Sequence, residues 1–289
     1  MIRATIRDVR PAHAAVLLFA GFFAAQTIGM VLSIAGLAVA LATGQIDRSL
    51  LDSAGLLGIF GHPLILLPSA VGSSAGFVLV AVAGAIFVKV PVREALAIRP
   101  APLAAWILVP IGVLGTAFVA DQAVYYFGRA LPWLTIGALE AFGQAARTDH
   151  PGAAVAVWIA MALVPGTCEE IFFRGAVQGA LASRWRGAAA VGLTAAAFGA
   201  IHVDPPQALG AGLLGLYLGA ATLHVRSVGP AIVAHVLNNS VAFAMSRFPE
   251  AATFGYGTDR PVPWVLVGVA AATAVAAFWA TLRWGRIPQ

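Results

Sequence analysis

Two carboxylates and a guanidinium stand close together in the chain, at Glu169, Glu170 and Arg174. Charged residues are rare here, because they make up only 10% of the 289 residues. On a helix, Glu170 and Arg174 are four residues apart and share a face, so we expect them to form a structural ion pair. Glu169 projects about 100° away from Glu170, and we expect its carboxylate to face a cavity and act as a general base. The alternative is an interfacial helix whose charged groups are simply hydrated.

Two later apolar segments supply polar side chains that could complete a site. His202 ends a segment of small apolar residues, and His235 and Asn239 lie four residues apart in a second segment. At this spacing the side chains of His235 and Asn239 project from one helix face. Asn238 lies on the flank of that face and is a weaker candidate. Each has an ordinary explanation as well, since a polar stripe can join membrane helices through hydrogen bonds.

Together these side chains have the chemistry for hydrolysing a peptide bond. Hydrolysis needs a base for water, donors for the developing oxyanion and an acid for the leaving amine. Glu169, the Asn239 amide and the two histidines could supply all three. The same residues could hold zinc, with Glu169, His202 and His235 as a set of three ligands that leaves a fourth position open. No H-E-x-x-H motif occurs in the chain, so we favour the glutamate mechanism while both cofactor states, none or zinc, stay open.

The composition indicates that these groups lie in a membrane. Hydrophobic residues make up 60% of the chain and the mean hydropathy is +0.89, whereas a soluble domain is typically about 45–50% apolar. Lipid is therefore the expected solvent. The net charge of +5 is explained by the orientation of loops, and no basic run with interleaved aromatic residues suggests a nucleic-acid partner. The single cysteine, Cys168, excludes an internal disulfide and is expected to be a packing residue.

The sequence predicts an all-α, polytopic bundle of about eight transmembrane helices, because each span needs about 20 apolar residues. The predicted spans are residues 12–42, 63–88, 102–127, 151–183, 187–203, 208–226, 229–247 and 262–282. Eight spans place both termini on one side of the membrane. That side carries Arg3, Arg7, Arg10, Lys89, Arg93, Arg99, Arg184, Arg186, Arg226, Arg283 and Arg286, and the other side carries Arg48, Arg129, Arg147, Arg247 and Arg260. The excess of basic residues places both termini in the cytoplasm.

A single membrane domain is expected over residues 1–289. Residues 1–150 provide N-terminal spans without a recognised motif, residues 151–247 form the core that bears the motifs, and residues 262–283 form the last span. The segment Pro132–Ala146 is apolar but short and contains Glu140, so we expect it to lie along the interface or to re-enter the membrane.

The run of residues 151–183 is too long for one straight span. Pro165 and Gly166 are expected to break it, since proline lacks a donor and clashes with the preceding turn. Thr167, three residues before Glu170, has the spacing of a capping box and is expected to start a helix. By helical rise, Glu169 and His202 lie roughly 22 Å deep and His235 only about 9 Å deep. A tilted helix or a sunken turn is therefore required to bring His235 to the others.

Three motifs occur in a fixed order along this core. They read E-E-x-x-x-R at Glu169–Arg174, F-x-x-x-H at Phe198–His202 and H-x-x-x-N at His235–Asn239. With Pro165 before the paired glutamates and Gly175 after the arginine, they resemble the motifs of the CAAX protease and bacteriocin-processing (CPBP, or Abi) family of intramembrane proteases, in particular the type II CAAX prenyl endopeptidases. The resemblance covers about residues 151–247.

The resemblance implies roles for individual residues. Glu169 resembles the catalytic glutamate of the family, and His202 would help it to hold and activate water. His235 and Asn239 match the positions proposed to stabilise the oxyanion, and Glu170 and Arg174 match the pair that supports the site. Members of the family are named metalloproteases, although a metal-independent glutamate mechanism is also argued for them.

The resemblance also implies a function. Family members cleave C-terminal tripeptides from prenylated proteins, process bacteriocins or give immunity to them, or have unassigned substrates. We therefore expect an intramembrane endopeptidase in a bacterial-type cell membrane, the inner or plasma membrane, whose partners are the lipid bilayer and a membrane-associated protein or peptide substrate. One alternative is a proton- or ion-coupled transporter, in which Glu and His chains are also common. A non-catalytic bacteriocin immunity or scaffold protein is the other.

Overall fold

The fold is known from a computed structural model, which describes residues 11–46, 62–134, 143–251, 253–255, 258 and 260–285. Within these residues the regular structure is helical and no β-strand occurs, so the prediction of an all-α, polytopic bundle is confirmed. Each segment predicted as a span contains a helix. These helices are α1 (Pro11–Ala42), α4 (Pro63–Phe87), α6 (Leu103–Ala130), the continuous helix Pro151–Ala182 that includes α8 to α10, α11 (Gly187–Ala200), α12 (Pro205–Val225), α13 (Gly229–Arg247) and α14 (Trp264–Trp284). The short helix α5 (Val92–Ala95) follows α4.

Six of the described helices are long and apolar enough to cross a membrane: α1, α4, α6, the helix Pro151–Ala182, α12 and α14. The helix α11 is apolar but has only 14 residues. The helix α13 has 19 residues and carries the polar stripe of His235, Asn238 and Asn239. The chain is therefore a multi-pass membrane protein, while the count of eight spans stays a prediction.

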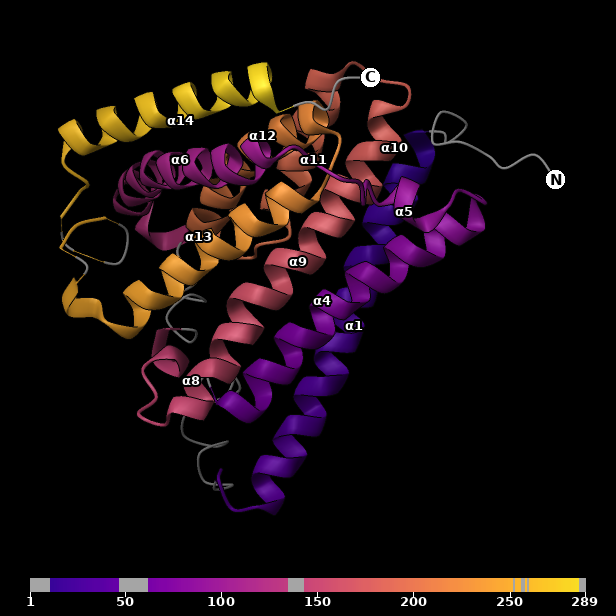
Figure 1. The fold of residues 1–289 in the computed structure, drawn as a ribbon. Coiled ribbons are helices and arrows are strands. Elements are labelled where there is room, and N and C mark those ends of the chain that lie inside the picture. The colour runs from indigo at the N-terminus through magenta and orange to yellow at the C-terminus, as the bar shows by residue number, and fades with distance from the viewer. Residues whose placement is uncertain are drawn as a thin grey trace.

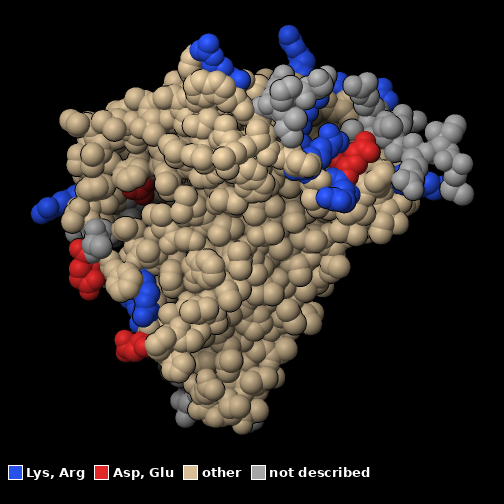
Figure 2. All heavy atoms as spheres, viewed as in Figure 1, with Lys and Arg blue, Asp and Glu red and all other residues tan. Residues whose placement is uncertain are grey.

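The outer surface is apolar over a wide area. On the face seen in Figure 2, the Lys, Arg, Asp and Glu side chains gather near the upper edge and along the left side, and the broad central and lower surface shows none. Large apolar side chains point outward from the first and last helices, for example Phe19, Phe23, Val265 and Val275, each more than 60% exposed. An exterior of this kind is suited to contact with lipid.

The helices form two groups on either side of the long helix Pro151–Ala182 (Figure 1). The antiparallel pair α1 and α4 packs against one side of it, and α13 packs against the other. Beyond α13, α6 packs against α14 and α12, and α11 packs against α12. Gly72 and Gly76, a G-x-x-x-G pair, lie where α4 meets α1, since a Cβ at Gly76 would come within 2.8 Å of the Ala25 backbone. Close helix contact through small residues is typical of membrane bundles.

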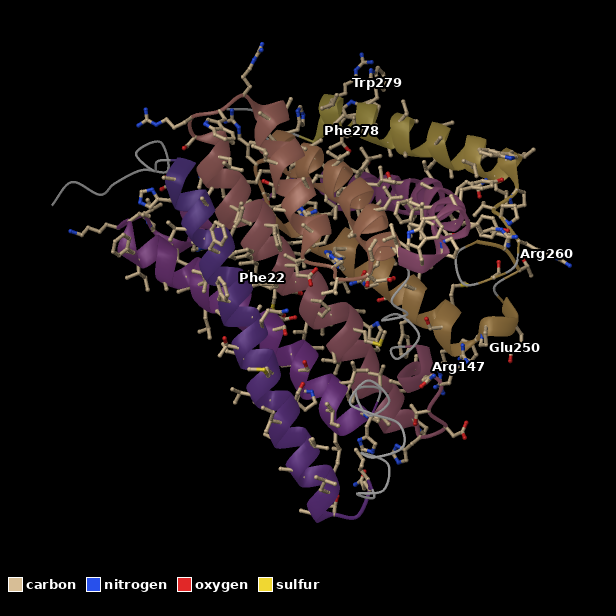
Figure 3. All side chains as sticks on the ribbon, turned by 180° about the vertical axis from the view of Figure 1, so that it is seen from behind. Phe22, Arg147, Glu250, Arg260, Phe278 and Trp279 are labelled. Atoms are coloured by element: carbon tan, nitrogen blue, oxygen red, sulfur yellow. The ribbon has the colours of Figure 1, made fainter. Side chains whose placement is uncertain are left out.

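The orientation in the membrane stays a prediction. Arg147, Glu250 and Arg260 lie along one edge of the bundle in Figure 3, and the sequence places the two arginines on the same side of the membrane. Several residues used for that prediction lie outside the described residues, namely Arg3, Arg7, Arg10, Arg48 and Arg286. Most of the segment expected to lie along the interface, including Glu140, is also outside them, and its described start is a short 3-10 helix, Pro132–Leu134.

Candidate active site

The first motif lies on one continuous helix. Its successive segments are α8 (Pro151–Trp158), the π-helical η3 (Ile159–Leu163), α9 (Val164–Glu170), the π-helical η4 (Ile171–Val177) and α10 (Gln178–Ala182). The predicted break at Pro165 and Gly166 is therefore wrong. In η3 the hydrogen bonds reach back five residues, as from Val164 N–H to Ile159 O, and this wider winding accommodates a proline, which cannot donate to the residue four positions back.

Thr167 does not start a helix, so the predicted capping box is wrong. The residue lies inside α9, and its hydroxyl donates to the Leu163 carbonyl oxygen at 2.7 Å. Because the chain is helical on both sides of Thr167, no free N-terminal amide needs a cap at this point. The bond from threonine to the preceding turn is instead the one that such residues make inside helices.

Glu170 and Arg174 form the predicted ion pair. Glu170 Oε1 accepts a hydrogen bond from Arg174 Nη1 at 2.8 Å, and both side chains are fully buried. The Arg174 guanidinium also lies over the ring of Phe198, with its Cζ 4.2 Å from the ring centroid. A charge buried in an apolar bundle is tolerated when it is paired and hydrogen-bonded, and here the opposite charge comes from one helical turn away.

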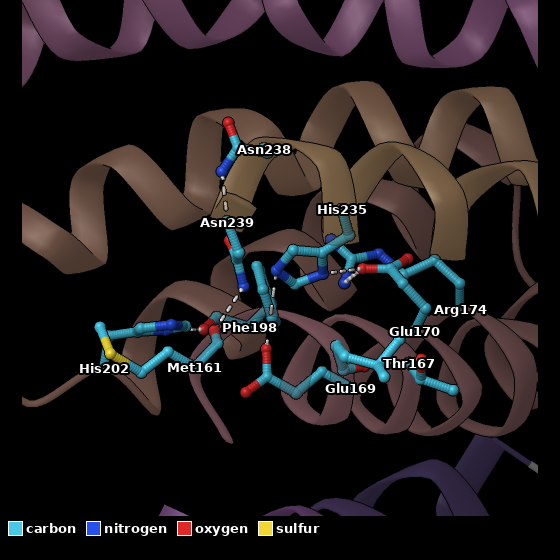
Figure 4. A network of polar contacts seen from close by, with 11 residues as sticks. Met161, Thr167, Glu169, Glu170, Arg174, Phe198, His202, His235, Asn238 and Asn239 are labelled. Carbon is cyan, nitrogen blue, oxygen red and sulfur yellow. Dashed lines mark hydrogen bonds and ion pairs between the residues drawn. The ribbon is translucent and has the colours of Figure 1, made fainter. Parts of the chain in front are cut away.

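His235 joins this pair from the opposite helix, α13. Its Nδ1 lies 2.8 Å from Glu170 Oε1, so the Nδ1–H donates to the carboxylate (Figure 4). That bond fixes the orientation of the imidazole and turns Nε2 towards Glu169, whose Oε2 lies 4.0 Å away. The link between Glu170 and His235 could not be read from the sequence, because the two residues are on different helices, 65 positions apart.

The two neighbouring glutamates have different surroundings, as predicted. The Glu170 side chain is fully buried between Arg174 and His235, whereas the Glu169 side chain is 14% exposed. In Figure 4 the Glu169 carboxylate points away from Arg174 and lies beside the ring of His235. Glu169 therefore has the freedom and the access that a reacting carboxylate requires, and Glu170 has neither.

Phe198 contacts both histidines of the site. Its ring makes edge contacts with His202, at 5.2 Å between centroids, and with His235, at 5.7 Å. His202 Nδ1 lies 2.9 Å from the Phe198 carbonyl oxygen. Since a carbonyl only accepts, Nδ1 carries the hydrogen and Nε2 remains available to bind water. The phenylalanine of the second motif thus positions Arg174, His202 and His235 at once.

Asn239 is held by hydrogen bonds on both of its polar atoms. Its Nδ2 donates to the Met161 carbonyl oxygen at 3.3 Å, and its Oδ1 accepts from Asn238 Nδ2 at 3.3 Å. Met161 is four residues before Pro165, which has no N–H to offer this oxygen. Proline therefore exposes a backbone acceptor to which α13 can bind. Asn238, the weaker candidate from the sequence, orients the stronger one.

Close approach of α13 to α9 depends on Gly166. A Cβ at this position would lie 2.9 Å from both the backbone nitrogen and Cγ2 of Val236, and 3.1 Å from its Cα. Because Val236 follows His235, the glycine sets the distance between His235 and the glutamates. In Figure 1 α13 lies obliquely across the long helix. This tilt brings His235 to the glutamates, although its position along an upright helix would place it at a different depth. The sequence names Gly166 only as a helix breaker, so its packing role was missed.

The possible zinc site does not fit this geometry. Among the described residues no three His, Cys, Asp or Glu side chains are arranged to hold a metal ion. The rings of His235 and His202 both pack against Phe198. The three suggested ligands, Glu169, His202 and His235, therefore do not converge on one point in this arrangement.

Comparison with protein families addresses the same part of the chain. Residues 151–241 match the family described as type II CAAX prenyl endopeptidase Rce1-like. Residues 151–241 are thus similar to the CAAX protease family. The match contains all three motifs, and it confirms the family that they indicate. No curated protein and no solved structure matches the chain.

This similarity supports an intramembrane protease in general terms. The matched residues run from the start of α8 into α13 and include each candidate site residue. The helices α1, α4, α6 and α14 lie outside the match.

Proposed function

We propose that this protein is an intramembrane endopeptidase that hydrolyses a peptide bond in or near the bilayer of the cell membrane, with a glutamate-activated water. Its substrate is a membrane-associated protein or peptide. Residues 151–247 form the catalytic core, and the remaining helices hold this core in the lipid as part of one membrane domain.

Glu169 is the general base in this mechanism. Water bound between the Glu169 carboxylate and His202 Nε2 gives its proton to Glu169 and attacks the carbonyl carbon of the scissile bond. The carbon–oxygen bond forms as the carbonyl double bond opens, which places negative charge on the substrate oxygen. Glu169 then returns the proton to the leaving nitrogen as the carbon–nitrogen bond breaks, so the carboxylate is regenerated.

His235 and Asn239 stabilise the developing oxyanion. The bond from Nδ1 to Glu170 directs Nε2 of His235 into the space beside Glu169, where this nitrogen faces the substrate oxygen. The Asn239 amide has a second N–H besides the one directed to Met161 O. Donors that are fixed before the reaction stabilise the transition state without reorganisation. Glu170 and Arg174 position His235 and do not react.

The observation that carries the proposal is the placement of the His235 imidazole between two carboxylates that differ in burial and in partners. Glu170 is buried and paired with Arg174, while Glu169 is approached by His235 at 4.0 Å and is partly exposed. This asymmetry supports a division between a positioning carboxylate and a reacting one. A purely structural cluster would gain nothing by leaving Glu169 weakly bound in an apolar bundle.

The test is the change Glu169→Gln, which keeps the shape of the side chain and removes the base. The purified protein in nanodiscs is given a farnesylated reporter peptide with a C-terminal CAAX tail, and the same peptide without the prenyl group. We expect cleavage to fall to the background with the Gln variant, while the exposed Glu250→Gln control keeps the wild-type rate. Normal cleavage by Glu169→Gln would disprove the assigned base.

A further inference from the structure

A second row of polar side chains starts at the candidate site and runs away from Glu169 along the same helix. Glu170, Arg174 and Gln178 are spaced by four residues on the long helix and are all buried, at 0%, 2% and 2% exposure. Across from them lies α12. Gln178 Nε2 donates to the Gly219 carbonyl oxygen at 2.9 Å, and Arg174 Nη2 lies 3.1 Å from the position of a Cβ on Gly215.

The glycines of α12 therefore make room for polar groups. Gly215 and Gly219 are a G-x-x-x-G pair, a pattern that usually brings two helix backbones together. Here the space beside these glycines is taken by the guanidinium of Arg174 and the amide of Gln178, with Ala195 and Val191 of α11 also close by. The three helices thus enclose a buried polar layer. We call it the polar seam, and define it as Glu170, Arg174, Gln178, Thr194 and Thr222.

Each member of the polar seam has a buried polar atom that no described protein group satisfies. These atoms are Glu170 Oε2, Arg174 Nε and Nη2, Gln178 Oε1, Thr194 Oγ1 and Thr222 Oγ1. Thr194 and Thr222 come from α11 and α12 and are only 1% and 5% exposed. Buried polar atoms in proteins are nearly always satisfied, by protein groups or by ordered water. By helical spacing, Thr194 shares a face of α11 with Val191, and Thr222 shares a face of α12 with Gly215 and Gly219, so these hydroxyls project toward the same three-helix contact. Polar atoms in such a contact are the setting in which buried waters are held by two to four bonds.

The spacing of the polar seam suits single water molecules. Residues four apart on a helix are separated by about 6 Å along the axis. Two hydrogen bonds of about 2.8 Å in series cover nearly the same distance. Glu170 and Arg174 are bonded directly, and one water between Arg174 and Gln178 would satisfy atoms on both of its sides.

One end of the polar seam approaches the polar end of the bundle. The helix α10 ends at Ala182, α11 begins at Gly187 and α12 ends at Val225. The neighbouring residues Arg184, Arg186 and Arg226 are exposed. The other end is Glu170, next to the candidate base. A row of polar groups with these two ends connects a charged surface with a site that must receive water in an apolar surrounding.

We propose that the polar seam binds a chain of ordered water molecules that supplies the hydrolytic water to Glu169 from the end of the bundle marked by Arg184, Arg186 and Arg226. The supply role rests on the proposed function, because only a hydrolase consumes water at Glu169. The bound water itself does not depend on that function. Thr194, Gln178 and Thr222 are the water-binding residues outside the candidate active site.

Bound water can be tested with D₂O as the only probe. Single-cysteine variants Thr194→Cys and Thr222→Cys are made in a Cys168→Ser background, and the exchange of S–H for S–D is followed by infrared spectroscopy in nanodiscs. The matched control is Thr281→Cys on α14, since Thr281 is equally buried but its hydroxyl is satisfied by the Ala277 carbonyl oxygen at 2.8 Å. We expect fast exchange at positions 194 and 222 and slow exchange at position 281. Equally slow exchange at all three positions would overturn the proposal, whether or not the protein is a protease.

The supply role is tested by removing one hydroxyl without changing its volume. Thr222→Val is expected to lower kcat about threefold to tenfold, the effect of about one lost hydrogen bond, with KM and the melting temperature little changed. Thr281→Val is the control, and any loss of stability from a buried Thr→Val change will be seen there too. Fast thiol exchange together with an unchanged kcat in Thr222→Val would overturn the supply role. An active Glu169→Gln protein would refute the proposed base and leave the thiol-exchange result standing.

Discussion

Gly166→Ala tests how the site is assembled, because α13 packs tightly against α9 at this glycine. Ordinary contacts of a Cβ begin at about 3.4 Å, and the added methyl group would lie 2.9 Å from the Val236 nitrogen. The new contact would therefore be about 0.5 Å too short. Backbone atoms of α13 cannot yield as a flexible side chain can, so the helix must move by about this amount, and His235 moves with it.

The magnitude follows from two effects. Overpacking of a tight helix contact typically costs about 1–3 kcal/mol of stability. A displacement of about 1 Å in a catalytic arrangement can cost about 100-fold in rate, so about half that shift at His235 predicts a loss of about tenfold in kcat. The loss of rate is expected at every temperature at which the protein stays folded.

The assay is cleavage of the farnesylated reporter in nanodiscs, with the melting temperature measured on the same preparation. Gly192→Ala on α11 is the matched control, because a Cβ there meets nothing within 4 Å, and alanine in a helix is favoured over glycine. We expect Gly192→Ala to keep its activity and to be at least as stable as the wild type. A Gly166→Ala protein with wild-type kcat would refute the assignment of His235 to the reaction through this contact.

Three further predictions concern the stability of the fold, the role of Phe198 and the dependence of cleavage on metal. Arg247 donates to the Ala146 and Thr148 carbonyl oxygens at 2.9 and 2.6 Å, so Arg247→Gln should destabilise the fold by about 1.5–3 kcal/mol, with Arg247→Lys milder in thermal unfolding. Phe198→Leu removes the ring that contacts Arg174 and should lower kcat more than it raises KM; a pure KM effect would contradict its positioning role. Dialysis against a chelator should leave reporter cleavage intact, and loss of cleavage that zinc restores would show that the metal-free mechanism is wrong.

The sequence predicted those parts of the site that depend on local spacing. The pairing of Glu170 with Arg174 follows from four residues of helical separation, and the structure confirms it at 2.8 Å. The helical segments follow from runs of apolar residues, and each predicted span contains a helix. Both the ion pair and the helices depend on residues that are close together in the sequence, so the sequence alone is enough to predict them.

Contacts between distant segments could not be predicted in the same way. The bond from His235 to Glu170 depends on the tilt of α13, and that tilt depends on what Gly166 allows. The wrong predictions at Pro165 and Thr167 have one common cause. Propensity rules treat a proline as the end of a regular α-helix, whereas η3 changes the winding just before it and lets the helix continue.

The hydrogen bond between Asn239 and the Met161 carbonyl oxygen has a consequence for how a substrate enters. In lipid, a free amide donor has no water to bind and is costly to leave unpaired. Asn239 avoids this cost because Pro165 leaves it a peptide oxygen of the protein's own backbone. An arriving substrate also presents a peptide oxygen, and the second N–H of the same amide can donate to it while the first stays on the Met161 oxygen. The bond to Met161 thus fixes the direction of the amide before the substrate arrives.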